Sequence, residues 1–262
     1  MVNAANVSMF VAVLFSVLPA MGLMYVMLDR FEGFFDEKRV FKFLVVGLIL
    51  GAVVVLVELL LLRFHDPGRL IGTPVMVGLP LLAVGYPLLE SVAKTAALNW
   101  HTVAGRPDAP YYGSALGIGF GAILTFITVG RGVRAFLLAP VPGVTHLEIG
   151  VFFTLLFLLF LGGIMAHAAS GAVIGRFTGD ADPLRALGYG TAILVPFYIG
   201  YYVVYTAPPS RLGGLTILVP LAVVLYGVVM LRYVRRLMDR IVPEDLAKQV
   251  RRDMRRRRRG VE

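Results

Sequence analysis

Four ionisable side chains interrupt the apolar stretches of this sequence: Glu58, Glu90, Lys94 and His167. A carboxylate and an imidazole held at the same depth can activate a water molecule by general base catalysis, or can bond to each other and hold helices together. Glu90 and Lys94 are four residues apart, so in a helix they share one face in the order that favours an ion pair. Lys94 can equally extend toward the headgroups of a bilayer. The residue types therefore leave a catalytic and a structural interpretation open.

The composition shows which solvent surrounds these groups. The chain has 262 residues, of which 58% are hydrophobic and only 16% are charged, whereas soluble domains are about 25% charged. The bilayer suits such a surface, provided that every backbone group is bonded internally. The sequence therefore predicts an all-α, polytopic membrane helix bundle. It contains no cysteine, which excludes disulfides, thiol catalysis and cysteine-bound metal.

The apolar stretches are long enough to cross a bilayer, which takes about 20 mostly apolar residues in a helix. We expect seven transmembrane helices, separated by short polar or Pro/Gly-rich loops. No basic region precedes the first stretch, so we expect it to be retained and not removed as a signal peptide. The seven stretches are Val7–Leu28, Phe41–Leu62, Thr73–Leu98, Tyr111–Val129, Ile149–Gly175, Ala186–Tyr205 and Leu212–Leu231.

The basic residues predict the orientation. Twelve of the 25 lie between Arg232 and Arg259, so residues 1–231 form the bundle and 232–262 a basic tail. By the positive-inside rule the C-terminus is cytoplasmic, and seven spans then place the N-terminus outside. We expect a multi-pass protein of the cell membrane. A basic segment next to a membrane is attracted to anionic lipid by about 1 kcal/mol per residue. The tail can instead dock a ribosome, RNA or an acidic partner, but its charge is not a folded nucleic-acid-binding face.

Glycines recur at helical spacing in the fourth and fifth stretches. Gly113, Gly117 and Gly121 form two overlapping G-x-x-x-G steps, and Gly171 and Gly175 form another. Such steps allow close backbone contact between membrane helices. We expect these five glycines to pack helices together and the fourth stretch to be central.

The position of each ionisable residue along its stretch sets its expected depth. Glu58 lies about one turn from the outer end of its stretch, so we expect it to reach the interface. Glu90 and His167 each lie about eight residues, or about 12 Å, from the inner end, so we expect them at one depth. No H-E-x-x-H zinc motif is present; the sequence predicts no cofactor and leaves a metal site open.

Three segments in order resemble the PrsW and CAAX-protease superfamily of intramembrane proteases, which also includes the Aph-type scaffold subunit of gamma-secretase. "LLESVAKTAAL" is similar to the family's E-E-x-x-K helix, with Glu90 as the first glutamate and Lys94 as the lysine. "YYGSALGIGFGAILTFI" resembles its glycine-rich span, and "IMAHAASGAVIGRF" its histidine span with His167. Ser91 and Leu124 replace two glutamates of the family pattern.

The resemblance implies two functions. As a protease of this type, the chain would use Glu90 as the base and His167 to bind or activate water, with Lys94 in support. As an Aph-type scaffold, it would hold partner transmembrane helices without catalysis. Because only some of the polar residues of the family pattern are present, we favour a degenerate, non-catalytic scaffold. The alternatives are an active intramembrane endopeptidase and a small proton- or ion-coupled transporter that uses Glu90 and His167.

Overall fold

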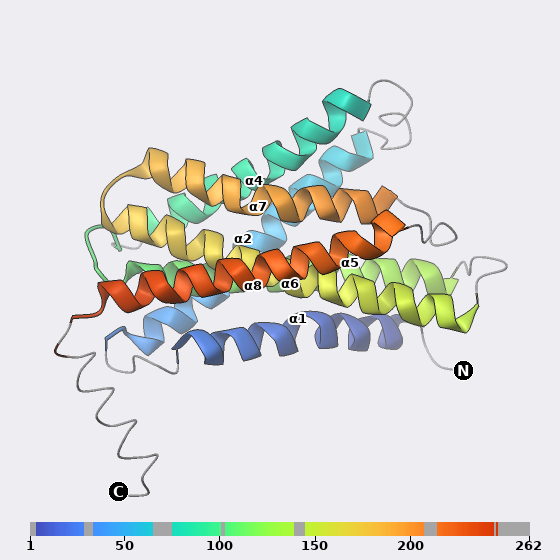
Figure 1. Ribbon diagram of the computed structural model, residues 1–262, viewed down its shortest axis with the longest axis horizontal. Helices are drawn as coiled ribbons and strands as arrows, with labels where there is room; N and C mark the ends of the chain where they lie inside the picture. Colours follow the sequence, from blue (N-terminus) through green and yellow to red (C-terminus); the bar gives the residue numbers. More distant parts are fainter. Residues whose placement is uncertain are drawn as a thin grey trace, which may run out of the picture.

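The computed structural model describes residues 4–28, 34–64, 75–100, 103–138, 145–206, 214–243 and 245. These residues form seven helices that lie side by side in an elongated bundle (Figure 1). The predicted all-α bundle is confirmed. The helices are α1 (Ala4–Leu28), α2 (Glu37–Phe64), α4 (Val75–Trp100), α5 (Ala109–Leu138), α6 (His146–Gly179), α7 (Pro183–Thr206) and α8 (Gly214–Ile241).

Six of these described helices are long and apolar enough to cross a bilayer. The chain is therefore a multi-pass membrane protein. The helix outside this set is α4, which contains both Glu90 and Lys94. In Figure 1 α4 nevertheless lies along one edge of the bundle, where it packs against α7. Successive helices alternate in direction, so α1 begins at the end of the bundle opposite to the end where α8 finishes.

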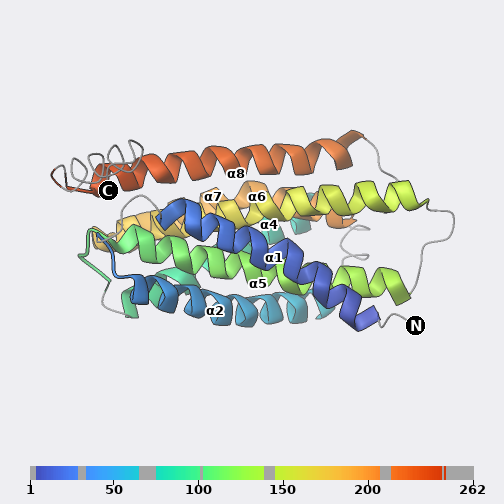
Figure 2. The same cartoon turned by 90° about the horizontal axis from the view of Figure 1, so that it is seen from below.

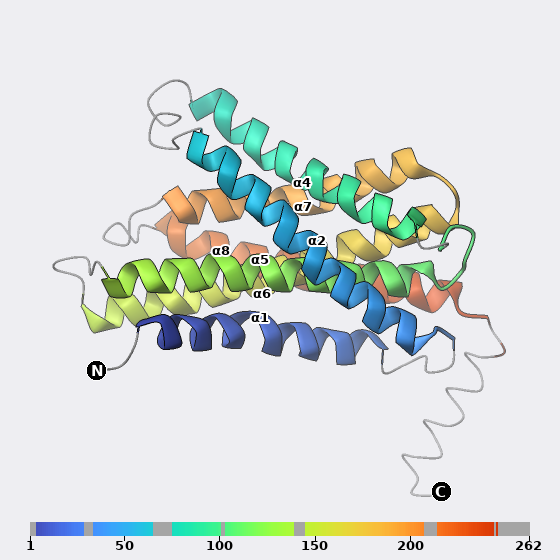
Figure 3. The ribbon, with the colours of Figure 1, turned by 180° about the vertical axis from the view of Figure 1, so that it is seen from behind.

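The helices α5 and α6 form the centre of the bundle. α1 and α2 pack on α5, while α7 and α8 pack on α6. Seen from below, α8 and α2 lie at opposite edges and α1 crosses over the middle (Figure 2). From behind, α2 and α4 lie close where α2 ends and diverge toward the other end of the bundle (Figure 3). The arrangement brings α2, α4, α6 and α7 around one point in the interior.

Glycines bring α5 and α6 into backbone contact. A Cβ atom on Gly113 would overlap the carbonyl oxygen of Gly171, and one on Gly117 would overlap that of His167. On α6, a Cβ atom on Gly171 or Gly175 would likewise overlap backbone atoms of α5. Only glycine allows this approach, because any side chain would push the two helices apart.

Two helices continue further than the sequence suggests. α5 runs to Leu138, so Arg131 and Arg134, which follow the predicted stretch Tyr111–Val129, lie within its last turns. α8 continues to Ile241, so the boundary after Leu231 falls inside a helix. The predicted tail is described only at its start, since Glu244 and residues 246–262 lie outside the described residues.

The start of the basic segment contacts the bundle. Arg235 on α8 donates from Nη2 to the carbonyl oxygen of Val26, 3.0 Å away. Val26 lies in the last turn of α1, where carbonyl groups lack a donor within their own helix. The arginine therefore caps the end of a neighbouring helix.

A polar contact fixes the turn before α5. Arg106 donates two hydrogen bonds of 2.9 Å to the Asp108 carboxylate, and the Tyr112 hydroxyl donates a third. Burial acts to raise the pKa of Asp108, but the hydrogen bonds from Arg106 and Tyr112 outweigh burial and hold this pKa below its usual value. The same Tyr112 oxygen accepts from the backbone N–H of Asp36, just before α2.

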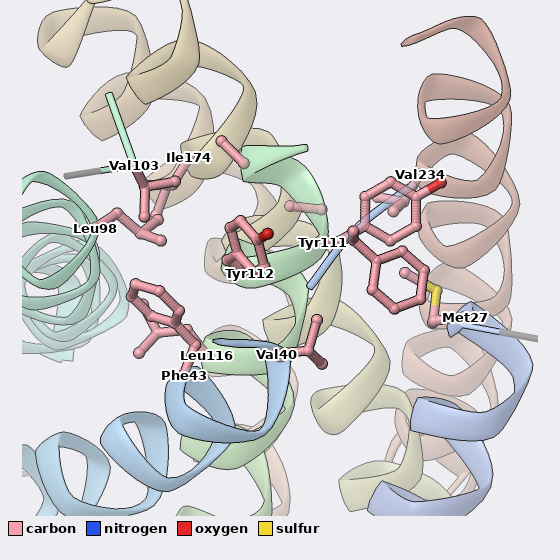
Figure 4. Close-up of a cluster of buried hydrophobic side chains, with 14 of the residues drawn as sticks. Met27, Val40, Phe43, Leu98, Val103, Tyr111, Tyr112, Leu116, Ile174 and Val234 are labelled. Atoms are coloured by element: carbon pink, nitrogen blue, oxygen red, sulfur yellow. The ribbon is translucent and has the colours of Figure 1, made fainter. Parts of the chain in front are cut away.

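A large apolar cluster fills the end of the bundle where α8 finishes (Figure 4). Leu98 lies one turn beyond Lys94 on α4 and is fully buried. Phe43 of α2 and Leu116 of α5 lie together in the same cluster, and the Phe43 ring stacks on Tyr112 at 5.7 Å. This cluster separates the middle of the bundle from the loops at that end.

Candidate functional site

The charged residues of α4 and the histidine of α6 meet in the bundle interior. Glu90, Lys94 and His167 are each 0% exposed. Lys94 Nζ lies 3.3 Å from Glu90 Oε2 and 3.1 Å from His167 Nδ1. Glu90 Oε2 also lies 3.3 Å from His167 Nδ1. The two helices therefore hold the three residues at one depth, in mutual contact.

Three neighbouring groups surround Lys94 Nζ and can stabilise a charged ammonium. It donates to the Glu90 carboxylate and faces the Nδ1 atom of His167. Its third side lies 4.7 Å from the centroid of the Phe120 ring, which provides a cation–π contact. An ammonium has three N–H donors, so each one has a direction in which it is stabilised. Lys94 therefore lies within the cluster, with no part of it exposed, and does not extend to the headgroups.

Two further residues complete the cluster: Glu58, and Tyr198, which the sequence did not single out. The Tyr198 hydroxyl of α7 donates to Glu90 Oε1 at 2.6 Å and lies 3.3 Å from Glu58 Oε1 of α2. Glu58 is 6% exposed, so the expectation that it reaches the interface is wrong. Its side chain turns inward, on the side where α2 contacts α4 and where the Tyr198 hydroxyl of α7 reaches it. The cluster thus links α2, α4, α6 and α7.

Aromatic rings surround the histidine. The Phe120 ring stacks on His167 at 6.2 Å, and Phe197 meets it edge-on at 5.5 Å. On α5, Gly121 lies against the His167 side chain, where an added Cβ atom would come within 3.1 Å of the histidine Cβ. A low local dielectric strengthens every polar contact in such a place and makes unpaired groups costly.

The contacts of His167 indicate its tautomer. Because Lys94 is a donor, the Nδ1 atom facing it accepts, and the ring proton then lies on Nε2. Nε2 is buried and has no hydrogen-bond partner among the described residues. The Glu90–His167 pair has the chemistry of a general base with a neighbouring imidazole, but its atoms are closed off from solvent. The described residues contain no group of three or more His, Asp and Glu residues that could hold a metal ion.

The sequence indicates that Glu58 needs a hydrogen-bond partner, but it gives almost no indication that Tyr198 belongs to the site. A carboxylate within an apolar stretch needs a partner, and this holds for Glu58 even near the end of its helix. Tyr198 is one of several aromatic residues of α7, and only the packing of α7 against α4 shows which hydroxyl meets a carboxylate.

In the comparisons with known proteins, no family model, no curated protein and no solved structure matches the chain. The fold and the site themselves define its class. It is a polytopic α-helical membrane protein whose centre holds a closed cluster of two glutamates, a lysine, a histidine and a tyrosine.

Proposed function

We propose that the protein is a non-catalytic scaffold of the cell membrane, which binds the transmembrane helices of a partner protein. The observation that carries the proposal is the 0% exposure of Glu90, Lys94 and His167. A catalytic base must reach a water molecule and a scissile bond. Here the groups contact one another and Tyr198 instead. The cluster acts as an internal brace between four helices.

The partner is inferred from the resemblance to the Aph-type scaffold and from the outer helices. Large apolar side chains cover the outward faces of α1 and α2, among them Phe10 and Phe41, with 64% and 66% of their surface exposed. Such faces suit lipid tails and equally the apolar surface of another transmembrane helix. The glycine-rich face of α5 is already occupied by α6, so a partner would contact the outer helices.

The test is photo-crosslinking in the native membrane. A photoreactive phenylalanine analogue would replace Phe10 on α1, Phe41 on α2 or Leu225 on α8, all of which point outward. A scaffold gives a discrete adduct with one membrane protein from at least one of these faces. Adducts with lipid alone from all three faces would refute partner binding.

The same adduct should form in the Glu90→Gln/Lys94→Met double variant, in which the cluster is uncharged. Its loss from a double variant that remains folded would contradict the bracing role. In that case the charges themselves would take part in the function.

An intramembrane endopeptidase is the second candidate, because Glu90 and His167 lie in contact and His167 Nε2 has no partner among the described residues. The protease would require the helices to separate and admit water and a peptide. Incubation of the reconstituted protein with fluorogenic transmembrane peptides tests this. Cleavage that disappears in Glu90→Gln would favour the protease over the scaffold.

A further inference from the structure

One hydroxyl group lies between two carboxyl groups inside the bundle. The Tyr198 oxygen is 2.6 Å from Glu90 Oε1 and 3.3 Å from Glu58 Oε1. The three residues come from α7, α4 and α2, and none is more than 6% exposed. The neighbouring ionisable groups are Lys94 and His167 on the Glu90 side. On the Glu58 side they are the phenols of Tyr86 and Tyr202.

The number of hydrogens that these three groups can donate shows which carboxyl group is protonated. A phenol has one hydrogen to donate, and the shorter contact assigns it to Glu90. If Glu58 were ionised, its oxygen would face the lone pairs of Tyr198, and a buried carboxylate would have no donor there. If Glu58 is a carboxylic acid, its O–H donates to the Tyr198 oxygen, and both carboxyl contacts of Tyr198 are hydrogen bonds. Buried charge is then balanced, with Glu90 negative and Lys94 positive.

We propose that Glu58, Tyr198 and Glu90 form a proton-binding relay, with the proton resting on Glu58 and able to pass to Glu90 through the phenol. In the transfer, the Glu58 O–H bond breaks as a new O–H bond forms on Tyr198. The original phenol proton moves to Glu90 Oε1 at the same time. Glu58 becomes a carboxylate and Glu90 a carboxylic acid, with no change in oxidation state. The ligand of this site is a proton, and the inference does not depend on a partner protein.

The position of Glu58 shows where the proton exchanges. Glu58 is the only carboxyl of the cluster with any exposure, and it lies six residues, or about 9 Å, before the end of α2. On the other side of the cluster, Leu98 and its apolar neighbours fill the bundle. The proton is therefore exchanged from the end of the bundle where α2 finishes, and Lys94 stabilises Glu90 as the anionic end of the relay.

Infrared spectroscopy of the full chain in lipid nanodiscs tests the relay. A buried carboxylic acid has a carbonyl stretch that is separate from the amide bands and shifts in D2O. At neutral pH the wild type should show this band. Glu58→Gln should abolish it, whereas Glu37→Gln at the exposed start of α2 should leave it unchanged. Tyr198→Phe should shift the band, because the acid loses its acceptor.

The Glu58→Gln variant also has to remain as stable as the wild type, because the glutamine amide donates to Tyr198 as the neutral acid does. Thermal unfolding of the same nanodisc samples measures this. A wild type without the band, a band that survives in Glu58→Gln, or a Glu58→Gln chain that fails to fold would each overturn the proposal.

Discussion

Removing one member of the Glu90–Lys94 pair should destabilise the protein far more than removing both. The two groups are 3.3 Å apart with fully buried side chains. Deleting one partner of such a pair leaves an uncompensated charge and costs about 3–5 kcal/mol, whereas replacing both by uncharged groups of similar size is often neutral. In a bilayer the unfolded chain also finds polar partners, so we expect about 3 kcal/mol for Glu90→Gln or Lys94→Met. The double variant should lie within about 1 kcal/mol of the wild type.

The measurement is reversible unfolding in mixed micelles, with the helix content followed by circular dichroism as the fraction of denaturing detergent rises. A loss of about 3 kcal/mol corresponds to a change of more than a hundredfold in the unfolding equilibrium. Lys42→Met supplies the control, because Lys42 is exposed near the start of α2. It should change the free energy of unfolding by less than about 0.5 kcal/mol.

Two results would refute this account of the cluster. If the loss of stability in the double variant equalled the sum of the two single losses, the charges would not stabilise each other, and each would act through another contact. If both single variants were as stable as the wild type, the Glu90 and Lys94 side chains would not be buried away from solvent. The expected outcome is a double variant that loses much less stability than the sum of the two single losses.

Three further predictions concern other parts of the bundle. Gly117→Ala should cost about 1–3 kcal/mol in the same unfolding assay, because its Cβ atom overlaps α6, whereas Gly132→Ala on the same helix, with open space around it, should be neutral or slightly stabilising. Burial raises the pKa of Asp108, but the hydrogen bonds from Arg106 and Tyr112 outweigh it and leave this pKa below its usual value. The ionised form therefore contributes stability that is present above the unfolded-state pKa of about 4 and is lost as pH falls through the folded-state pKa. Asp108→Asn should remove this acid dependence, and an Asp108→Asn chain with the wild-type profile would contradict it. Arg235→Ala should speed amide hydrogen exchange in the last turn of α1 several-fold, and unchanged exchange there would show that its cap contributes nothing.

The sequence predicted the fold class because membrane solvation leaves few alternatives. Long apolar stretches must form helices when no water is present to satisfy the backbone, and the seven described helices follow the seven stretches closely. The ends were less predictable. α5 passes Val129 and includes Arg131 and Arg134, since long basic side chains can lie along a helix and still reach polar surroundings. Charge alone therefore ended the predicted helix too early.

The candidate site was predictable only in part. Glu90 and His167 could be placed at one depth by counting residues, and the structure brings them to 3.3 Å. The sequence indicates that Glu58 needs a partner, but it does not show on which side of α2 that partner lies, because the apolar residues of α2 mark no single inner face. The role of Tyr198 depends on how α7 rotates against α4, which is a property of packing.

The glycine face of α5 and the charged cluster depend on each other. Gly117 lies on the His167 carbonyl and Gly121 on its side chain, so the absence of Cβ atoms on α5 sets how far α6 projects toward α4. A larger residue at either position would move the imidazole away from Lys94 and Glu90, and would weaken buried contacts of 3.1–3.3 Å. Such a loss is costly for polar groups inside the bundle. A Gly117→Ala chain should therefore lose part of the coupling between Glu90→Gln and Lys94→Met, whereas Gly132→Ala should retain all of it. An unchanged coupling in Gly117→Ala would show that the two features stabilise the bundle independently.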